Sequence, residues 1–116
     1  MGRGTAKIAQ GIRNLTTQIF FALSDPHRQE ILLRLARGGP QTTLTLLKGI
    51  GATRQGATRH LSILEEAGLV KSEKRGREII REFNPEAVTL AQQWFADLEH
   101  AWDSRLDRLR KQYEPE

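Results

Sequence analysis

Four side chains of the types that read DNA bases lie close together in the middle of the chain: Arg54, Gln55, Thr58 and Arg59. Arginine can donate two hydrogen bonds to a guanine edge, glutamine can pair with adenine, and threonine can meet a thymine methyl group or a phosphate. Apolar residues at helical spacing are interleaved with them: Ala57, Leu61 and Leu64. A helix with this pattern buries one face and offers the other to the major groove. The alternative interpretation is that the arginines only solubilise a surface helix.

A second basic group surrounds a glycine shortly after this helix: Lys74, Arg75 and Arg77 around Gly76. The flanking segments, 69–73 and 78–83, have strand-forming composition, so a β-hairpin with its turn at 74–77 is predicted. Leu69, Phe83 and one of Ile79 and Ile80 are available to the core. Basic side chains on such a wing can follow phosphates or enter the minor groove. Arginine clusters on hairpins are common, so this cluster alone is a weak indication of DNA binding. Its position directly after the predicted recognition helix makes the indication stronger.

The elements that must hold these two groups are mostly helical. Helices are predicted over residues 15–23, from 26 to a stop at Gly38-Gly39-Pro40, over a short segment that opens at Thr42 or Thr43 and runs through Leu47 or as far as Ile50, over 54 to about 67, and over about 86–112. Asp25 is expected to cap the second helix, with Pro26 in its first position, and Thr53 to cap the fourth. Gly68 is expected to end the fourth helix. The order of helix, helix, short helix, helix, hairpin and long helix predicts a mainly α fold with a small β-hairpin, of the winged helix-turn-helix type.

Composition limits the kind of protein. The 116 residues suit one domain, and 38% apolar residues suffice for one modest core. The net charge of +4 is uneven, since residues 48–81 carry +4 and residues 82–116 carry −4. That distribution favours a polyanion contacting the middle of the chain, although an ordinary solvated surface would also explain it. Without cysteine there are no disulfides, thiolate metal sites or cysteine nucleophiles. No apolar run suits a membrane span and no signal-peptide pattern is present, so a cytoplasmic protein without a membrane partner is expected.

The predicted last helix carries an apolar stripe with steps of three or four residues: Val88, Ala91, Phe95, Leu98, Trp102, Leu106, Leu109 and Tyr113. Such a stripe exceeds what a small core needs to cover. We therefore predict a homodimer with this interface: Leu15, Ile19, Phe20, Phe95, Leu98, Trp102, Leu106 and Leu109. The alternative is that the helix folds back onto its own domain.

Two longer motifs and the basic wing follow one another along the chain: Ala22-Leu23-Ser24-Asp25-Pro26-His27-Arg28 leading into Glu30-Ile31-Leu32, then Arg59-His60-Leu61-Ser62-Ile63-Leu64-Glu65-Glu66-Ala67-Gly68-Leu69-Val70, then Arg75-Gly76-Arg77. In these motifs the chain resembles the ArsR/SmtB family of bacterial winged-helix regulators over roughly residues 15–112. The resemblance implies a homodimer that binds a two-fold operator on double-stranded DNA, usually as a repressor. It places the DNA-facing helix positions on Thr53, Arg54, Gln55, Thr58, Arg59 and His60.

The chain departs from the best-known members of that family, which sense metals. Where one of their sites uses cysteines, residues 43–47 contain no thiol. Another site pairs acids and histidines on the last helix, which here offers Asp97, Glu99, His100 and Asp103 but no second histidine. Zinc prefers imidazole or thiolate ligands, so we expect no metal and no cofactor, and a regulator of the metal-independent type. Any small-molecule effector is left unidentified by the sequence.

Other function classes have weaker support. His27 lies near Asp25, but neighbours at a helix start usually serve in capping, and no phosphate loop or catalytic triad is visible. We therefore predict that the chain is not an enzyme. A winged helix that binds protein or RNA stays open as the alternative. The expected organisation is an arm over 1–13, flexible or partly helical, a DNA-binding domain over 14–85 and a dimerisation helix over 86–116.

Overall fold

The computed structural model describes the backbone of residues 2–113, without the side chains of residues 2–9, 12 and 13. Its helices are α1 (Gly2–Ala22), α2 (Pro26–Gly38), α3 (Thr43–Leu46), α4 (Arg54–Glu66) and α5 (Val88–Tyr113), and a 3-10 turn, η1 (Pro85–Ala87), precedes α5. The strands are β1 (Gln41–Thr42), β2 (Val70–Arg75) and β3 (Glu78–Phe83). The mainly α fold with a small hairpin is thus confirmed. Residues 114–116, which we included in the last segment, lie outside the described residues, as does Met1 of the expected arm.

The first helix is longer than predicted. We expected it over 15–23, whereas α1 runs without a break from Gly2, so most of the expected arm is the first half of this helix. Gln10 and Asn14 are joined on it by a side-chain hydrogen bond of 3.1 Å across one turn. The basic side chains of the expected arm lie outside the described side chains.

Side-chain caps begin the three helices that follow α1. The Asp25 carboxylate accepts hydrogen bonds from the backbone N–H groups of His27 and Arg28, and Pro26 occupies the first turn of α2, as predicted. Thr42 caps α3 through the N–H of Thr45. Thr53 caps α4 through the N–H of Gly56. Each cap satisfies a backbone donor that the helix itself leaves unpaired.

The sheet has three antiparallel strands in the order β1-β3-β2, of which the sequence revealed only the hairpin β2–β3. Lys74 and Arg75 belong to β2, where they pair with Ile79 and Glu78, so the turn is shorter than the predicted 74–77. Gly76 has a φ of +63°, a backbone conformation that glycine adopts without strain. The two-residue strand β1 pairs with the middle of β3 and so ties the start of α3 to the wing.

The core forms where the C-terminal half of α1 meets α2, α4 and the base of the hairpin. Its fully buried large side chains are Ile19, Ile31, Leu35, Leu46, Leu61, Leu64 and Leu69. Phe83 packs against this core and Ile80 is half-buried, whereas Ile79 is exposed on the wing. Burial of the apolar face of α4 fixes which of its faces points outward.

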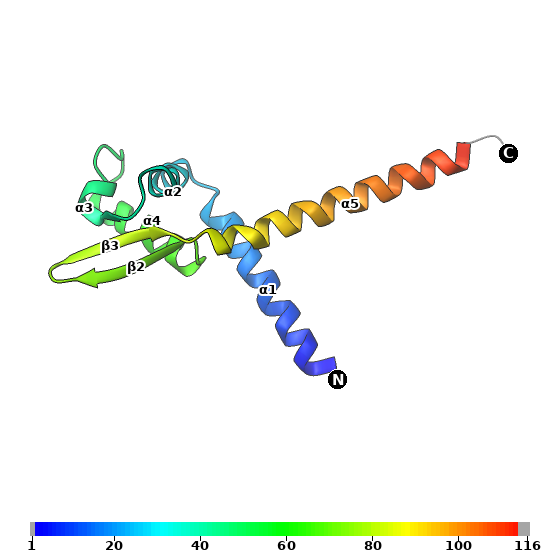
Figure 1. The fold of residues 1–116 in the computed structure, drawn as a ribbon, viewed down its shortest axis with the longest axis horizontal. Coiled ribbons are helices and arrows are strands. Elements are labelled where there is room, and N and C mark those ends of the chain that lie inside the picture. The colour runs from blue at the N-terminus through cyan, green and yellow to red at the C-terminus, as the bar shows by residue number, and fades with distance from the viewer. Residues whose placement is uncertain (1, 114–116) are drawn as a thin grey trace.

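The protomer is elongated. Its radius of gyration is 19.4 Å, against roughly 13 Å for a compact domain of about this size. Figure 1 shows the reason, since the hairpin projects at one end, α5 extends from the other, and α1 leaves the body at an angle. Within α5 only Ala91 is buried. Most of a 26-residue helix therefore lies outside the protomer's own core.

Candidate nucleic-acid interface

The first two turns of α4 present a polar face to solvent. Its residues are all exposed: Thr53, Arg54, Gln55, Thr58 and Arg59. The opposite face is held in the core by Ala57, Leu61 and Leu64. The hydroxyl of Thr58 donates to the carbonyl oxygen of Arg54 at 3.0 Å. Arg54, Gln55 and Arg59 are thus exposed on a helix whose opposite face is fixed in the core, as base reading requires.

Gly56 keeps the start of α4 intact. A Cβ atom at this position would lie 3.0 Å from Oγ1 of Thr53, tighter than ordinary contact. That oxygen accepts the capping hydrogen bond from the N–H of Gly56, also at 3.0 Å. Glycine inside a helix costs about 1 kcal/mol relative to alanine. Here it allows the cap to sit directly against the polar face.

The wing carries its basic side chains at and next to the tip of the β2–β3 hairpin. Lys74, Arg75 and Arg77 are exposed, and Arg75 forms an ion pair of 3.2 Å with Glu73 in which both side chains are 67% exposed. Exposed pairs of this kind contribute less than about 1 kcal/mol. Arg75 can therefore exchange Glu73 for a phosphate at little cost.

Arg81, on β3, connects the wing to the helices, and no sequence pattern distinguished it. Its guanidinium donates to Oγ1 of Thr43 at 3.0 Å and to Oγ of Ser72 at 2.8 Å, and it forms an ion pair with Glu65 of α4. The Arg81 side chain is 12% exposed, and its burial lowers the pKa of the guanidinium. One side chain thus links β3 with α3, β2 and α4, and holds the wing beside α4.

Comparison with known proteins agrees with this geometry. A family model described as "Helix-turn-helix domain" matches residues 23–73. The HTH-type transcriptional regulator YuzN of Bacillus subtilis (strain 168) is 38% identical over 76 residues, which cover 60% of this chain and 83% of that protein. The transcriptional repressor SdpR of the same organism is 26% identical over 88 residues, covering 76% and 97%. An ArsR-like transcriptional regulator from Rhodococcus sp. RHA1 is 31% identical, covering 91% of this chain and 99% of that chain, with a TM-score of 0.78.

The chain belongs to the ArsR family. It is a DNA-binding transcriptional regulator with a winged helix-turn-helix fold. The resemblance read from the two sequence motifs is confirmed. The helix-turn-helix of this ArsR-family protein consists of α3 and α4, and the wing is the β2–β3 hairpin.

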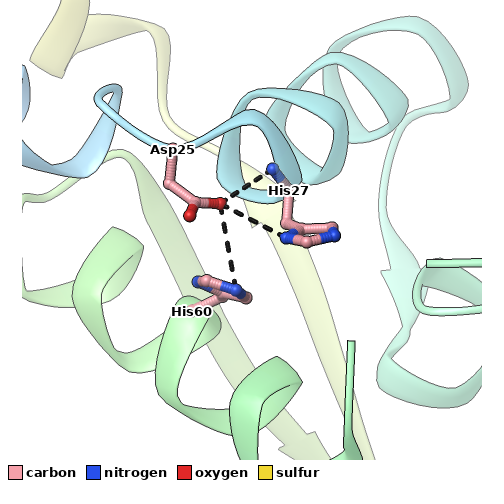
Figure 2. Close-up of side chains that lie close together, drawn as sticks. All are labelled: Asp25, His27 and His60. Atoms are coloured by element: carbon pink, nitrogen blue, oxygen red, sulfur yellow. Dashed lines mark hydrogen bonds and ion pairs between the residues drawn. The ribbon is translucent and has the colours of Figure 1, made fainter. Parts of the chain in front are cut away.

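One of the predicted DNA-facing residues lies elsewhere. His60 sits on the side of α4 that faces α2, where its side chain is 15% exposed and its Nδ1 lies 3.1 Å from a guanidinium nitrogen of Arg28. Figure 2 shows its ring pointing toward Asp25 and His27 at the start of α2. In this ArsR-family protein His60 is therefore occupied within the protomer and is not part of the outward polar face.

The apolar residues predicted at the dimer interface fall into two groups. Leu15 and five side chains of α5 are exposed: Phe95, Leu98, Trp102, Leu106 and Leu109. Phe20 is partly buried, and its ring packs edge-on against Trp94 and Phe95. Ile19 is only 1% exposed because it belongs to the protomer's own core, so it has no surface left for a partner. An open hollow of about 850 Å³ lies beside Phe20 and Trp94, between α1 and α5.

Within residues 2–113, no helix of this ArsR-family protein is both long enough and apolar enough to cross a bilayer. The longest helix, α5, carries charged residues from Asp97 to Lys111.

Proposed function

We propose that this protein is a homodimeric cytoplasmic repressor that reads an inverted-repeat operator on double-stranded DNA. Residues 14–85 form its DNA-binding domain and residues 86–116 its dimerisation helix, with residues 1–13 as an N-terminal extension. Repression follows most simply from occupying a promoter, and the relative SdpR is named a transcriptional repressor. The protein acts by binding and not as an enzyme.

The observation that carries the DNA-reading part of the proposal is the outward face of α4. Thr53, Arg54, Gln55, Thr58 and Arg59 are exposed there, while the opposite face of the same helix is buried. The N-terminal turns of a recognition helix are the part that reaches base edges. We assign base reading to Arg54, Gln55 and Arg59, and phosphate contact to the basic residues of the wing.

The two roles predict different losses on substitution. Arg54→Ala or Arg59→Ala should relax specificity at one base position, at a cost of about 1–3 kcal/mol on the operator. Arg75→Ala should weaken binding to every duplex alike and reduce the dependence on salt. The operator is first obtained by selection from random duplexes at two salt concentrations, with half-sites expected about one helical turn apart. Equal losses on operator and random DNA for Arg54→Ala would refute its role in base reading.

The dimer part of the proposal depends on the apolar surface of α5. Phe95, Leu98 and Trp102 are 52%, 53% and 55% exposed on one face of a helix that its own protomer does not cover. Soluble proteins rarely leave a contiguous apolar surface of this kind exposed unless it is an interaction site. A second copy that packs α1 and α5 against the same surface would bury it by two-fold symmetry.

Trp102→Glu tests this interface. The charge would be buried without a partner in the dimer, so the variant should sediment as a monomer at concentrations where the parent is a dimer. His100→Glu is the matched control, because His100 is exposed on the opposite side of the same helix turn. If Trp102→Glu keeps the mass of the parent, the stripe on α5 is not the interface.

A further inference from the structure

Three side chains with metal-ligating atoms meet between the first turn of α2 and the second turn of α4: Asp25, His27 and His60 (Figure 2). Oδ1 of Asp25 lies 3.6 Å from Nδ1 of His27 and 3.9 Å from Nε2 of His60. All three donor atoms lie within 4.8 Å of one another. Both measured separations exceed a hydrogen bond, which spans about 2.7–3.2 Å. The carboxylate thus lies at ion-pair distance from both rings without being hydrogen-bonded to either ring.

These separations are close to those around a bound metal ion. With bond lengths of about 2.0–2.2 Å and tetrahedral angles, two ligands of one Zn²⁺ lie roughly 3.3–3.5 Å apart. The Asp25–His27 and Asp25–His60 pairs need to close by only a few tenths of an ångström. The donor atoms of His27 and His60 lie within 4.8 Å of each other, so this pair must close by up to about 1.3 Å.

The carboxylate is already held in place. Oδ1 of Asp25 accepts from the backbone N–H of His27 at 2.8 Å and of Arg28 at 3.3 Å, because Asp25 caps α2. An aspartate carboxyl is ionised at neutral pH, as a metal ligand must be. The two capping hydrogen bonds orient this carboxylate.

The cluster is open on one side. The side chains of His27, Asp25 and His60 are 42%, 31% and 15% exposed, so an ion has an entry path and a fourth ligand position faces solvent. Two imidazoles and one carboxylate suit first-row transition ions, whereas Ca²⁺ and Mg²⁺ need more oxygen ligands than this cluster offers.

Arg28 is a positively charged neighbour that opposes a cation here. Its guanidinium nitrogen lies 3.1 Å from Nδ1 of His60, so in the metal-free protein Nδ1 accepts and Nε2 carries the ring proton. Binding a metal through Nε2 moves that proton to Nδ1 and breaks the contact. Arg28 keeps its bonds to the carbonyl oxygens of Ala22 and Phe21, at 2.8 and 3.1 Å. The ion would thus replace one link between α2 and α4 with another.

We propose that Asp25, His27 and His60 bind a divalent first-row transition metal ion such as Zn²⁺, with water as the fourth ligand. From the sequence we predicted no metal site, because only the cysteine positions and the last helix were considered and His60 lies 33 residues from His27. The site is separate from the outward face of α4 and does not depend on dimerisation.

Titration with Co²⁺, followed by visible absorption, tests the proposal. The protein is used as the full chain without a histidine tag. The chain has three histidines and no cysteine, so the ligands can be assigned by substitution alone. We expect the intense bands of four- or five-coordinate Co²⁺, without thiolate transitions, and their loss when Zn²⁺ displaces the cobalt. A spectrum that stays that of the aqueous ion in the presence of the parent protein would overturn the proposal.

Three substitutions and one control complete the test. His27→Gln and His60→Gln should each weaken Co²⁺ binding by at least about 100-fold, since loss of an outer-shell partner alone costs about 10–100-fold. Asp25→Asn should weaken it while keeping the cap, because asparagine also caps helices. His100→Gln is the control and should bind as the parent does. The His27 side chain is 42% exposed, so we expect His27→Gln to fold like the parent protein. If His27→Gln binds Co²⁺ as tightly as the parent does, the proposed site is wrong. Loss of Co²⁺ binding in His100→Gln would also contradict it.

Discussion

Arg28→Met should strongly destabilise the protein, because Arg28 joins three elements at one buried point. The residue is 7% exposed. Its guanidinium donates to the Ala22 carbonyl oxygen at 2.8 Å and contacts Nδ1 of His60 at 3.1 Å. Ala22 needs this donor, since the residue four positions later is Pro26, which has no N–H to continue the helical pattern. Arg28 therefore satisfies the end of α1 while linking α2 to α4.

The size of the loss follows from these bonds. Hydrogen bonds from a charged donor contribute about 1.5–3 kcal/mol each. The Phe21 carbonyl oxygen keeps Ser24 as a donor, and the Ser24 hydroxyl, 3.4 Å from the Arg28 guanidinium, is exposed to water, so the main losses are the bonds to Ala22 and His60. Removing a buried charge also removes its desolvation cost, so the lower value applies, which is about 3 kcal/mol for the two. With an unfolding entropy of about 2 cal/mol/K per residue, this corresponds to a fall of about 12 °C in Tm.

Thermal unfolding followed by circular dichroism measures this shift, at one protein concentration because association would raise Tm. Arg37→Met is the matched control, on the same helix but exposed, and should change stability by less than about 0.5 kcal/mol. Equal midpoints for the two variants would show that the Arg28 bonds contribute nothing net. A double-mutant cycle with His60→Gln would then isolate the share of the Arg28–His60 contact.

Three further outcomes are expected. Asp25→Asn should remove a pH dependence: the Asp25 pKa is lowered in the folded state, so its stabilisation is present above about pH 4 and is lost on acidification, and denaturant midpoints of parent and variant should converge at low pH. Leu64→Ala should cost about 2–5 kcal/mol by urea unfolding, since Leu64 is 0% exposed, whereas Leu44→Ala, at 80% exposure, should cost almost nothing. Arg81→Met should lower both stability, by roughly 1–3 kcal/mol, and operator affinity; unchanged affinity in a folded variant would show that Arg81 does not position the wing.

Local sequence signals predicted the part of the fold that local chemistry decides. Asp25 with Pro26 marked the start of α2, and Thr53 marked the start of α4, because capping depends on residues within one turn. The apolar spacing of Ala57, Leu61 and Leu64 correctly identified the buried face of α4. That face determined which polar side chains point outward.

Contacts between distant segments could not be predicted in the same way. The strand β1 has two residues, and it forms only because β3, about 40 positions later, pairs with it. Arg81 has no local pattern that distinguishes it from a solvated strand arginine, and its partners come from α3, β2 and α4. His60 and Ile19 were assigned outward roles that the packing of α2 and of the core does not allow. In each case the deciding neighbour is remote in sequence.

The contacts of Arg81 between the wing and the helices also affect whether the protein or the DNA must deform when the two bind. Because Arg81 is bonded to Thr43 and Ser72 and paired with Glu65, the hairpin and α4 behave as one stiff unit. When α4 contacts base edges and the wing contacts the flanking phosphate backbone, the protein therefore sets the distance between these two contacts on the DNA. The DNA reaches this spacing by bending or by narrowing a groove, and the free-energy cost of that deformation depends on the DNA sequence. We therefore expect base composition outside the contacted positions to influence affinity, an indirect readout that originates in a single buried side chain.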